Sequence, residues 1–511
     1  MRKGLIQKID TREIKMVYKK VIIKETPRLL GLLDRNPLSA TYGCFDRNYW
    51  HYKISDFPCA RFQEGVLVLT YLYNMKGTEF YRNKKIFSWI IAGLNFWKKI
   101  QHTNGSFDEW YPHENSFVAT SFSTCAITES LIILKKEIEK STYLDAITRA
   151  GNWLKDRTER RAQNQDAGAI MALYNIYLIT GNEKFKKIAE DKLEGLLNEQ
   201  TDEGWFYEYG GPDIGYLSLC VDYLAKYYKR TGNRKVLQAL KKALEFLKYF
   251  LHPDMTVGGT YGSRNTEYLI PNGFEILSSK DRNAQIIASH MIKSLEQGKI
   301  IGPNFLDDRY LVYNGYTYLQ ASENFYKNKI YQPMYKKNFT KDFPRAGILI
   351  HSYKGNYLIV NYRKGGAYKQ FYKNKLISTD SGIEGVYNKK KCIGDVTDRI
   401  TKNDGKYILE GRFRTITNQT ISPKKNVIIR VFQSSFGRNE KIGKILKEKM
   451  RNRLITDRDF TKLRFKREII FEKNKIKVKD SIPEVIEISQ KGKHSYDFIP
   501  SSKYFQYSDL E

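Results

Sequence analysis

The 511-residue sequence has few cysteines, few histidines and no long apolar run. Its five cysteines are odd in number and form no Cys-X-X-Cys pair or Cys/His cluster, so neither a disulfide framework nor a structural zinc site is indicated. No stretch approaches the ~20 apolar residues of a membrane span, and the basic N-terminal residues lack the apolar core of a signal peptide. These absences predict a cytoplasmic protein without a metal or other cofactor.

Acidic residues are scarce compared with basic ones. Lys and Arg number 87 against 56 Asp and Glu, which gives a formal net charge of +31. A field of this sign attracts polyanions such as nucleic acid, anionic lipid surfaces and uronate-containing or sulfated glycans. Because lysine is spread over the whole chain, a compositional bias explains part of the excess equally well. The sequence contains no recognisable nucleic-acid-binding module, so we predict no nucleic acid partner.

The apolar content is sufficient for more than one folded domain. Hydrophobic residues make up 41% of the chain and aromatic residues 14%. A chain of this length exceeds what a single hydrophobic core usually organises. We predict an N-terminal segment over 1–59 that packs on a helical domain, the helical domain itself over 60–335, and an antiparallel β-domain over 343–511.

The helical domain is predicted from its periodicity. From about Arg61 to Asn328, apolar residues recur at intervals of three and four. Two of the predicted helices end in Thr-Gly-Asn, at 180–182 and 231–233, where Gly and Asn suit a left-handed cap. Loops rich in Gly, Trp and Tyr recur at intervals of roughly 50 residues, which predicts one helix hairpin per repeat and a solenoid or closed α/α toroid. One hairpin per repeat places these loops on the same rim.

Beyond Phe343 the pattern changes to short alternating segments separated by Gly, Asn and Lys turns. Strands are predicted at 347–353, 356–363, 406–417, 425–436 and 462–482. Together they predict an antiparallel β-sandwich with a solvated face. A basic amphipathic helix is expected at 440–453, either as a solvated covering helix or as a segment that associates weakly with an anionic membrane surface.

A hairpin toroid followed by an antiparallel β-sandwich resembles the heparinase II/III-like polysaccharide lyases. Locally, the resemblance is carried by EGWFYEYGGPDIGY at 203–216 and GGTYGSRNTEY at 258–268. Members of this family cleave uronate-containing polysaccharides by β-elimination. They use a Tyr, often with a His, as base and acid, and an Asn, an Arg or a protonated acid to neutralise the substrate carboxylate. Such lyases are commonly exported and often have further histidines, whereas this sequence has no signal peptide and few histidines.

The resemblance implies a base for the C5 proton, a proton donor for the leaving oxygen and a partner for the carboxylate. Tyr207, Tyr209 and Tyr261 are the candidates for proton transfer, and Arg264 would supply the positive charge that a Tyr base needs. His113 is a candidate base, or holds a Tyr in orientation. For each Tyr the alternative is sugar stacking or packing, and for His113 it is a surface position without a role.

Carboxylates and amides of the rim loops complete the candidate site. Glu208 is a further predicted catalytic residue, and Glu114 and Asp213 accompany it in these loops. A glycoside hydrolase requires two opposed carboxylates, so these residues also support that chemistry. Asn164 is the candidate partner of the substrate carboxylate, while Asn164 or Asp166 could equally cap the following helix.

The segment Tyr42–Lys53 is dense in aromatic and charged residues, and either closes the toroid over an anionic sugar or packs as a buried plug. The predicted substrate-binding residues are Arg47, Trp50, His51, Lys53, Tyr111, Glu114, Asn164, Asp166, Trp205, Tyr207, Asp213, Arg264 and Asn265. We therefore predict an enzyme that cleaves an acidic polysaccharide or oligosaccharide by β-elimination. The alternatives are a glycoside hydrolase and a non-catalytic binding or assembly factor for surface polysaccharide biosynthesis. The sequence does not indicate an oligomeric state.

Overall fold

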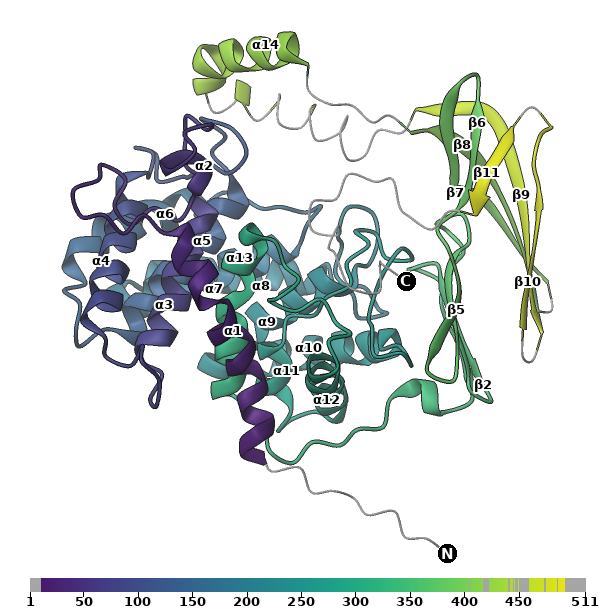
Figure 1. Ribbon diagram of the computed structural model, residues 1–511, viewed down its shortest axis with the longest axis horizontal. Coiled ribbons are helices and arrows are strands. Elements are labelled where there is room, and N and C mark those ends of the chain that lie inside the picture. The colour runs from purple at the N-terminus through teal and green to yellow at the C-terminus, as the bar shows by residue number, and fades with distance from the viewer. Residues whose placement is uncertain are drawn as a thin grey trace, which may run out of the picture.

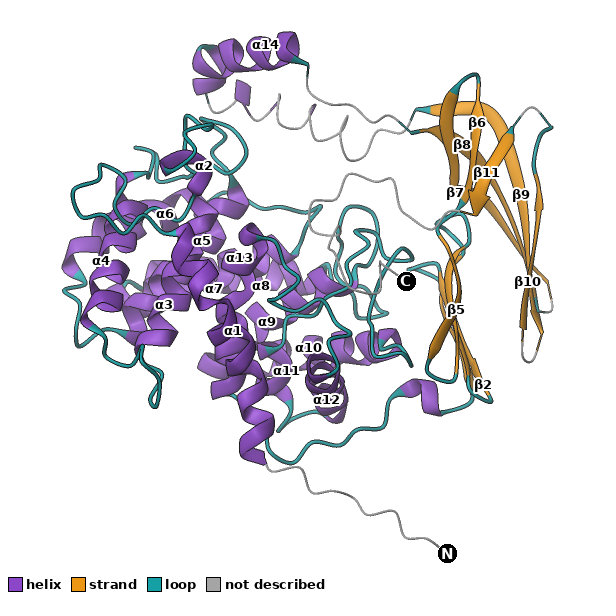
Figure 2. Cartoon of the chain, viewed as in Figure 1, coloured by secondary structure: helices purple, strands orange, loops and turns teal. Residues whose placement is uncertain are grey.

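The protein consists of a helical body and two β-sheets beside it (Figures 1 and 2). The computed structural model describes residues 11–403, 405–416, 422–439, 459–472, 475–484 and 486–491, with isolated positions between 442 and 449. Helices make up the part before residue 335, and strands make up most of the part after it. No helix within these residues is long and apolar enough to cross a membrane.

Inner and outer helices alternate along the chain. The inner helices are α3 (Gly65–Tyr73), α5 (Phe117–Ile133), α7 (Asn164–Thr180), α9 (Ile214–Thr231), α11 (Asn272–Leu277) and α13 (Asp308–Glu323). The outer helices are α1 (Thr11–Leu32), α4 (Lys84–Lys99), α6 (Ser141–Lys155), α8 (Glu183–Asn198), α10 (Arg234–Leu247) and α12 (Arg282–Glu296). The short helices are α2 (Arg47–Trp50), η1 (Ala60–Glu64), η2 (Lys248–Phe250) and η3 (Met334–Lys336).

The inner helices form a closed ring. Each contacts the next in chain order, and α13 contacts α3, which joins the last hairpin to the first. Helix α1 packs against α13 and so serves as its outer partner. The predicted α/α toroid is therefore confirmed. Residues 11–32, for which the sequence pattern predicted no helix, are helical and complete the outer layer.

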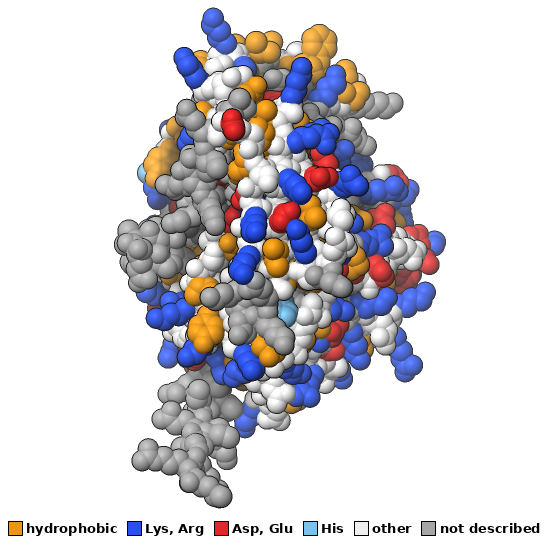
Figure 3. All heavy atoms as spheres, turned by 90° about the vertical axis from the view of Figure 1, so that its right-hand side faces the viewer, with side chains coloured by type: hydrophobic (Ala, Val, Ile, Leu, Met, Phe, Trp, Pro, Cys, Tyr) orange, Lys and Arg blue, Asp and Glu red, His pale blue; other side chains and the backbone are white. Residues whose placement is uncertain are grey.

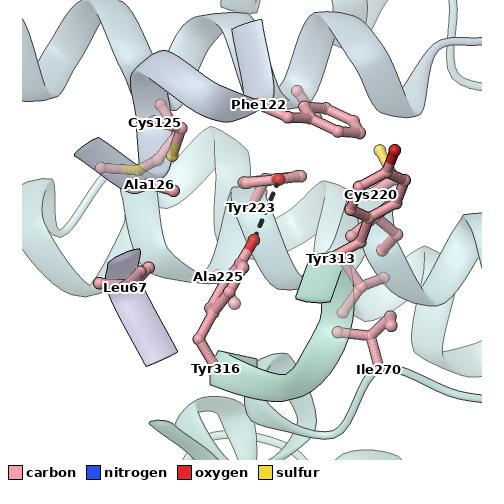
Figure 4. Packing of buried hydrophobic residues seen from close by; sticks show 14 of the residues in the cluster. Leu67, Phe122, Cys125, Ala126, Cys220, Tyr223, Ala225, Ile270, Tyr313 and Tyr316 are labelled. Carbon is pink, nitrogen blue, oxygen red and sulfur yellow. Dashed lines mark hydrogen bonds between the residues drawn. The ribbon is translucent and has the colours of Figure 1, made fainter. Parts of the chain in front are cut away.

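Composition explains which helices lie inside. Almost every residue of α5 is buried, and its many Ser, Thr and Ala residues let neighbouring helices approach closely. Its Thr120 and Ser123 hydroxyls donate to carbonyls one turn back, so burying them leaves no donor unsatisfied. The outer helix α10 buries one face only and is polar on the other. At the ring axis, the Tyr223 and Tyr316 hydroxyls lie 3.4 Å apart, and Phe122 packs 5.1 Å from the Tyr223 ring (Figure 4).

The hairpin turns follow the predicted chemistry. Gly181 and Gly232 end α7 and α9 in the left-handed conformation, with φ of 70° and 68°. The side chains of Asn182 and Asn233 then accept backbone N–H groups at the starts of α8 and α10. One Thr-Gly-Asn turn thus ends one helix and caps the next.

Three of the loops that lead from an outer helix into the next inner helix have a glycine at the equivalent place. Gly43, Gly105 and Gly204 have φ of 92°, 93° and 97°. A Cβ at these positions would lie 2.2, 2.3 and 2.2 Å from the carbonyl oxygens of Ala92, Arg149 and Lys242, respectively, on α4, α6 and α10. Two residues after each glycine stands a buried Phe: Phe45, Phe107 and Phe206. The loop backbone therefore lies directly on an outer helix, with an aromatic anchor beneath it.

The strands form two antiparallel sheets. The first has the order β1-β2-β3-β4-β5, and the second has the order β10-β9-β8-β7-β6-β11. The strands of the first sheet are β1 (Phe339–Phe343), β2 (Ile348–Tyr353), β3 (Asn356–Asn361), β4 (Ala367–Tyr372) and β5 (Lys375–Asp380). Those of the second are β6 (Ile383–Tyr387), β7 (Lys390–Asn403), β8 (Lys406–Thr415), β9 (Phe460–Glu472), β10 (Lys475–Ser481) and β11 (Glu487–Lys491).

The first sheet is the middle layer of the molecule. Ile350 and Ile359, paired across β2 and β3, belong to the same apolar core as the toroid. Leu349 and Leu358, on the opposite face, pack with Leu409 and other residues of the second sheet. Because side chains alternate between the faces of a strand, β3 is buried on both sides. The predicted β-sandwich is confirmed, and one of its sheets also rests on the toroid.

One predicted strand is a helix. Residues 425–436, expected to be extended because Val and Ile cluster there, lie mostly in α14 (Pro423–Ser434), followed by η4 (Phe436–Arg438). Ser422 accepts the N–H of Lys425, and Pro423 stands in the first turn, which is the usual start of a helix. Most of the amphipathic helix predicted at 440–453 lies outside the described residues.

We expect Gly204→Ala to destabilise the protein more than Gly181→Ala. Both glycines have positive φ, but a Cβ at 204 meets the backbone of α10, whereas a Cβ at 181 meets nothing within 4 Å. Left-handed backbone costs ~1–2 kcal/mol for a non-glycine residue, and the clash adds ~1–3 kcal/mol at position 204 only. Urea unfolding of the two variants measures the difference. Equal losses of unfolding free energy would contradict the close packing of loop on helix.

Candidate functional site

The loops that lead into the inner helices all lie at one rim. Because an antiparallel outer helix separates successive inner helices, the inner helices run parallel and their N-terminal ends share that rim. Those ends carry partial positive charge. The first sheet touches the same loops: Asn361 Nδ2 donates to the Tyr261 carbonyl at 2.7 Å, and Glu203 Oε1 accepts the N–H of Arg345 at 2.6 Å. The rim therefore faces the β-domain (Figure 1).

Tyr209 is held in a strained conformation beside Glu208 and Asn164. The N–H of Tyr209 donates to the carbonyl of Arg161 at 2.6 Å, and Gln163 donates to the carbonyl of Tyr207 at 3.1 Å, so two rim loops pair like strands. Tyr209 has a φ of 49°, which is uncommon for a bulky non-glycine residue. Asn164 Nδ2 donates to Glu208 Oε2 at 2.5 Å.

The guanidinium of Arg264 lies over the ring of Tyr209, with Cζ 4.6 Å from the ring centroid. Arg264 is buried, yet its Nε makes no hydrogen bond with any described residue. Two groups fix its loop. Asp213 Oδ2 accepts the N–H of Arg264 at 3.0 Å, and Lys364 of the β-domain donates to Asn265 Oδ1 at 2.6 Å. A guanidinium with one nitrogen left without a hydrogen-bond partner among the described residues is suited to bind an anionic group of a ligand.

Glu208 is a buried acid, only 4% exposed. Burial raises its pKa well above the ordinary value, the charge of Arg264 opposes this rise, and the charge of Asp213 adds to it. The neutral form, which can donate a hydrogen bond, is therefore favoured at Glu208.

A second cluster of charged and aromatic residues lies at the ends of α3 and α13 and in the loop before α5. Arg61 Nε donates to Glu64 Oε1 at 2.8 Å, and burial raises the pKa of Glu64 to about 7. The guanidinium of Arg309 lies over Trp110, with Cζ 4.2 Å from the ring centroid. Trp110 is 50% exposed, and the buried Nη1 of Arg309 makes no hydrogen bond with a described residue. An exposed ring beside an available cation suits an acidic sugar.

Tyr261 does not face the rim. It is fully buried, its hydroxyl lies 2.8 Å from His252 Nε2, and its ring stacks on Phe250. Burial raises its pKa well above the ordinary value, so the phenolate form is disfavoured. The predicted partnership of Arg264 with Tyr261 is replaced by its contact with Tyr209.

Several predicted binding residues hold the loops in place instead. Both oxygens of Asp213 accept hydrogen bonds, from the N–H groups of Tyr216, Arg264 and Thr266 and from the Thr266 hydroxyl. Glu114 Oε2 accepts the N–H groups of its own loop at 109 and 110. Asp166 Oδ2 accepts the N–H of Glu159 at 2.9 Å, and the buried Trp205 donates to Glu203. These hydrogen bonds shape the rim loops.

The remaining predicted residues surround these clusters. Tyr207 is half-buried, with its ring 4.9 Å from that of Trp205. His113, with a φ of 60°, has its ring 5.8 Å from that of His102, and Tyr111 is half-buried in the same loop.

The N-terminal candidates belong to the Arg309 side of the rim. Arg47 Cζ lies 5.0 Å from the ring centroid of Tyr52, while His51 and Lys53 are exposed. Trp50 is anchored, because its Nε1 donates to the carbonyl of Leu32 at 2.8 Å. Burial raises the pKa of Asp46, and the positive charge of Arg309 offsets part of this rise.

Sequence reasoning missed the second cluster. Trp110 stands in one of the loops rich in Gly, Trp and Tyr, so its aromatic composition was an available signal. Arg61, Glu64 and Arg309 lie on the first turns of helices, where periodicity gives them no special place. They reach the rim only because the ring closes.

A closed α/α ring with a charged, aromatic rim and two antiparallel sheets behind it defines the class of this protein: an α/α toroid with a C-terminal β-domain. No protein-family profile and no curated protein matches the sequence. Among solved structures, chondroitin AC lyase from Streptomyces coelicolor A3 is similar with a TM-score of 0.49 and 10% identity, over 81% of this chain and 68% of that one.

Heparinase III is similar with a TM-score of 0.46 and 11% identity, over 82% of this chain and 62% of that one. An unsaturated glucuronyl hydrolase from Streptococcus agalactiae, mutant D115N, has a TM-score of 0.41 and 12% identity, over 62% of this chain and 92% of that one. At these identities and TM-scores, the similarity assigns neither residues nor a reaction to this chain.

The pH dependence of stability tests whether the Asp166 carboxyl is buried and serves the structure. Burial, the main cause, raises its pKa to about 6. The folded state then binds this proton more tightly than the unfolded chain, whose Asp has a pKa near ~3.9, so the unfolding free energy falls as the pH rises from ~4 to ~6. In Asp166→Asn this fall should shrink by up to about 3 kcal/mol.

Urea unfolding at several pH values measures that slope, with Asp156→Asn, an exposed residue of the same loop, as the matched control. The control should keep the slope of the unsubstituted protein. An Asp166→Asn slope equal to that of the control would contradict the buried carboxyl.

Proposed function

We propose that this protein is an enzyme that cleaves a uronate-containing polysaccharide or oligosaccharide by β-elimination at the rim of the toroid. The observation that carries the proposal is the cluster of Tyr209, Arg264, Glu208 and Asn164, in which a tyrosine lies beneath a cation and beside an acid that favours its neutral form. These are the groups that elimination next to a carboxylate requires.

Tyr209 is assigned the proton transfers. As base it must carry negative charge on its phenol oxygen, and a guanidinium over its ring stabilises that charge. The same hydroxyl then returns the proton to the leaving oxygen, on the same side of the sugar. His113 lies in a different loop of the rim and is assigned no transfer.

Glu208 and Asn164 are assigned to the substrate carboxylate. When the C5 proton leaves, negative charge spreads into that carboxylate, and groups that donate hydrogen bonds to it lower the barrier. A neutral Glu208 can donate one such bond, and the amide of Asn164, which now donates to Glu208, can donate another. Arg264 adds a fixed positive charge close to both.

The charge of the chain supports an acidic substrate. Lys and Arg exceed Asp and Glu about two to one between residues 337 and 511, so this third of the chain carries most of the net charge of +31. Figure 3 shows basic side chains spread over the face that the β-domain presents. At the rim, Arg309 and the exposed ring of Trp110 supply a second place for an acidic sugar.

The hydrolase alternative has less support. A hydrolase needs two carboxyl groups directed at the bond that is cleaved. Of the candidates, Asp213 and Glu114 accept backbone N–H groups of the rim loops. A non-catalytic glycan-binding or assembly factor in the cytoplasm would use the same cations without the proton transfers.

The decisive measurement is ultraviolet absorbance of the products from a panel of acidic polysaccharides. β-Elimination leaves a double bond conjugated to the carboxylate, whereas hydrolysis leaves no chromophore. Tyr209→Phe should retain binding and lose turnover by about 10²–10⁴-fold, because it lacks only the hydroxyl. Tyr228→Phe, which removes a hydroxyl from a half-buried tyrosine near the C-terminal end of α9, away from the rim, should keep its activity. Full activity of Tyr209→Phe would refute the proposal, and binding without any cleavage would favour the assembly factor.

Glu208→Gln tests the neutral acid. Because Gln stays uncharged, the variant should cleave at low pH at a rate within about 10-fold of the unsubstituted enzyme, as expected when one hydrogen-bond donor replaces another. Activity that depends on neutral Glu208 is lost when the pH rises through its raised pKa, and the variant should lack this loss. The pH profile of kcat/KM measures both effects, with the exposed Glu190→Gln as control. A hydrolase would be favoured if Glu208→Gln is inactive at every pH and the products of the active control do not absorb in the ultraviolet.

A further inference from the structure

Helix α14 and η4 leave the second sheet between β8 and β9 and lie apart from both sheets, above α2 (Figure 1). An ion pair fixes α14 to the toroid: Arg430 Nη1 lies 3.0 Å from Asp56 Oδ1. Arg430 Cζ is also 5.7 Å from the ring centroid of Phe57. Neither sheet needs α14 and η4 to be complete, so the role of this insertion is sought in the surface that it exposes.

The outward face of α14 is apolar. Val427 is 62% exposed, Ile428 67% and Val431 63%. Their spacing of three and four residues places them on one side of the helix. Phe436 of η4 follows with 67% exposure. Aliphatic and aromatic side chains grouped in this way mark an interaction surface, whereas scattered exposed residues do not.

The opposite side of α14 is the inward one. Arg430 points to Asp56, and Gln433, three residues on, is only 2% exposed. Each of Val427, Ile428 and Val431 is more than 60% exposed, so all three face solvent. The apolar face is therefore available to a partner without any movement of α14.

Basic residues surround this face. The helix has no acidic residue, and besides the inward-facing Arg430 it carries Lys424 and Lys425, with Arg438 in η4. Lys424 and Lys425 are exposed beside the apolar row, and their long side chains allow the ammonium groups to reach outward while the stems lie on apolar surface. An apolar stripe flanked by cations is the pattern of helices that lie in the interface of an anionic bilayer.

We propose that α14 and η4 form a docking surface for anionic lipid membranes, on which Val427, Ile428, Val431 and Phe436 insert between headgroups while the basic residues contact the lipid phosphates. The charge decides among possible partners. A second copy would bring the same cations against each other. An acidic glycan would neutralise the cations but leave the aliphatic side chains in water. A membrane of anionic lipid satisfies both groups.

The test is co-sedimentation of the full-length protein with vesicles of phosphatidylcholine and phosphatidylglycerol, compared with vesicles of phosphatidylcholine alone. We expect binding to the anionic vesicles that weakens with added salt. Val431→Asp should lower the partition coefficient by at least about 10-fold, because a charge is placed in the inserted face. Leu178→Asp, a substitution at a leucine of α7 that is 45% exposed, is the matched control and should bind normally.

A second variant separates the charge from the apolar face. Lys424→Glu with Lys425→Glu should also reduce binding to anionic vesicles, while it leaves cleavage or binding of a soluble acidic glycan unchanged. Equal binding by Val431→Asp and Leu178→Asp would overturn the proposal. Two other results would also overturn it: an oligomer in analytical ultracentrifugation that Val431→Asp dissociates, or loss of soluble-glycan binding in Val431→Asp. Circular dichroism of each variant confirms that the fold is intact.

Discussion

Closure of the inner ring is the constraint on which the rest of this structure depends. Helix α13 must meet α3, and only then do the first turns of all inner helices lie around a single rim. The glycines at 43, 105 and 204 make this possible, because their loops lie against the backbone of outer helices at distances that exclude a side chain. Arg61 and Arg309, more than two hundred residues apart in sequence, share one cluster through this closure.

The β-domain contributes to the rim as well as covering it. The first sheet is buried on one face by the toroid and on the other by the second sheet, so its position is fixed from both sides. Asn361 and Lys364, at the end of β3 and in the turn after it, bond to the loop of residues 261–265. That loop carries Arg264 onto Tyr209. The geometry of the candidate site therefore belongs to both domains, although none of the four assigned side chains comes from a strand.

The sequence was most informative where local chemistry decides structure. Thr-Gly-Asn turns specify where one helix ends and the next begins, and the alternation in β2 and β3 reports strands directly. Exposure of a loop residue depends on contacts from elsewhere, so composition could not show that Tyr261 and Trp205 are buried anchors while Tyr209 remains half-buried. In the same way, Val and Ile at 427–431 favour a strand locally, yet a capped helix start at Ser422 prevails.

Pairing of α1 with α13 also has a consequence for biosynthesis. Tyr18 on α1 donates to Glu275, 257 residues later, and Arg28 contacts Asp308. A ribosome delivers the chain from its N-terminus, so the apolar side of α1 stays without its native partner until most of the ring has been made. Contacts over such long sequence separations also slow folding. Nascent chains of this protein should therefore be substrates for molecular chaperones until α13 leaves the ribosomal tunnel.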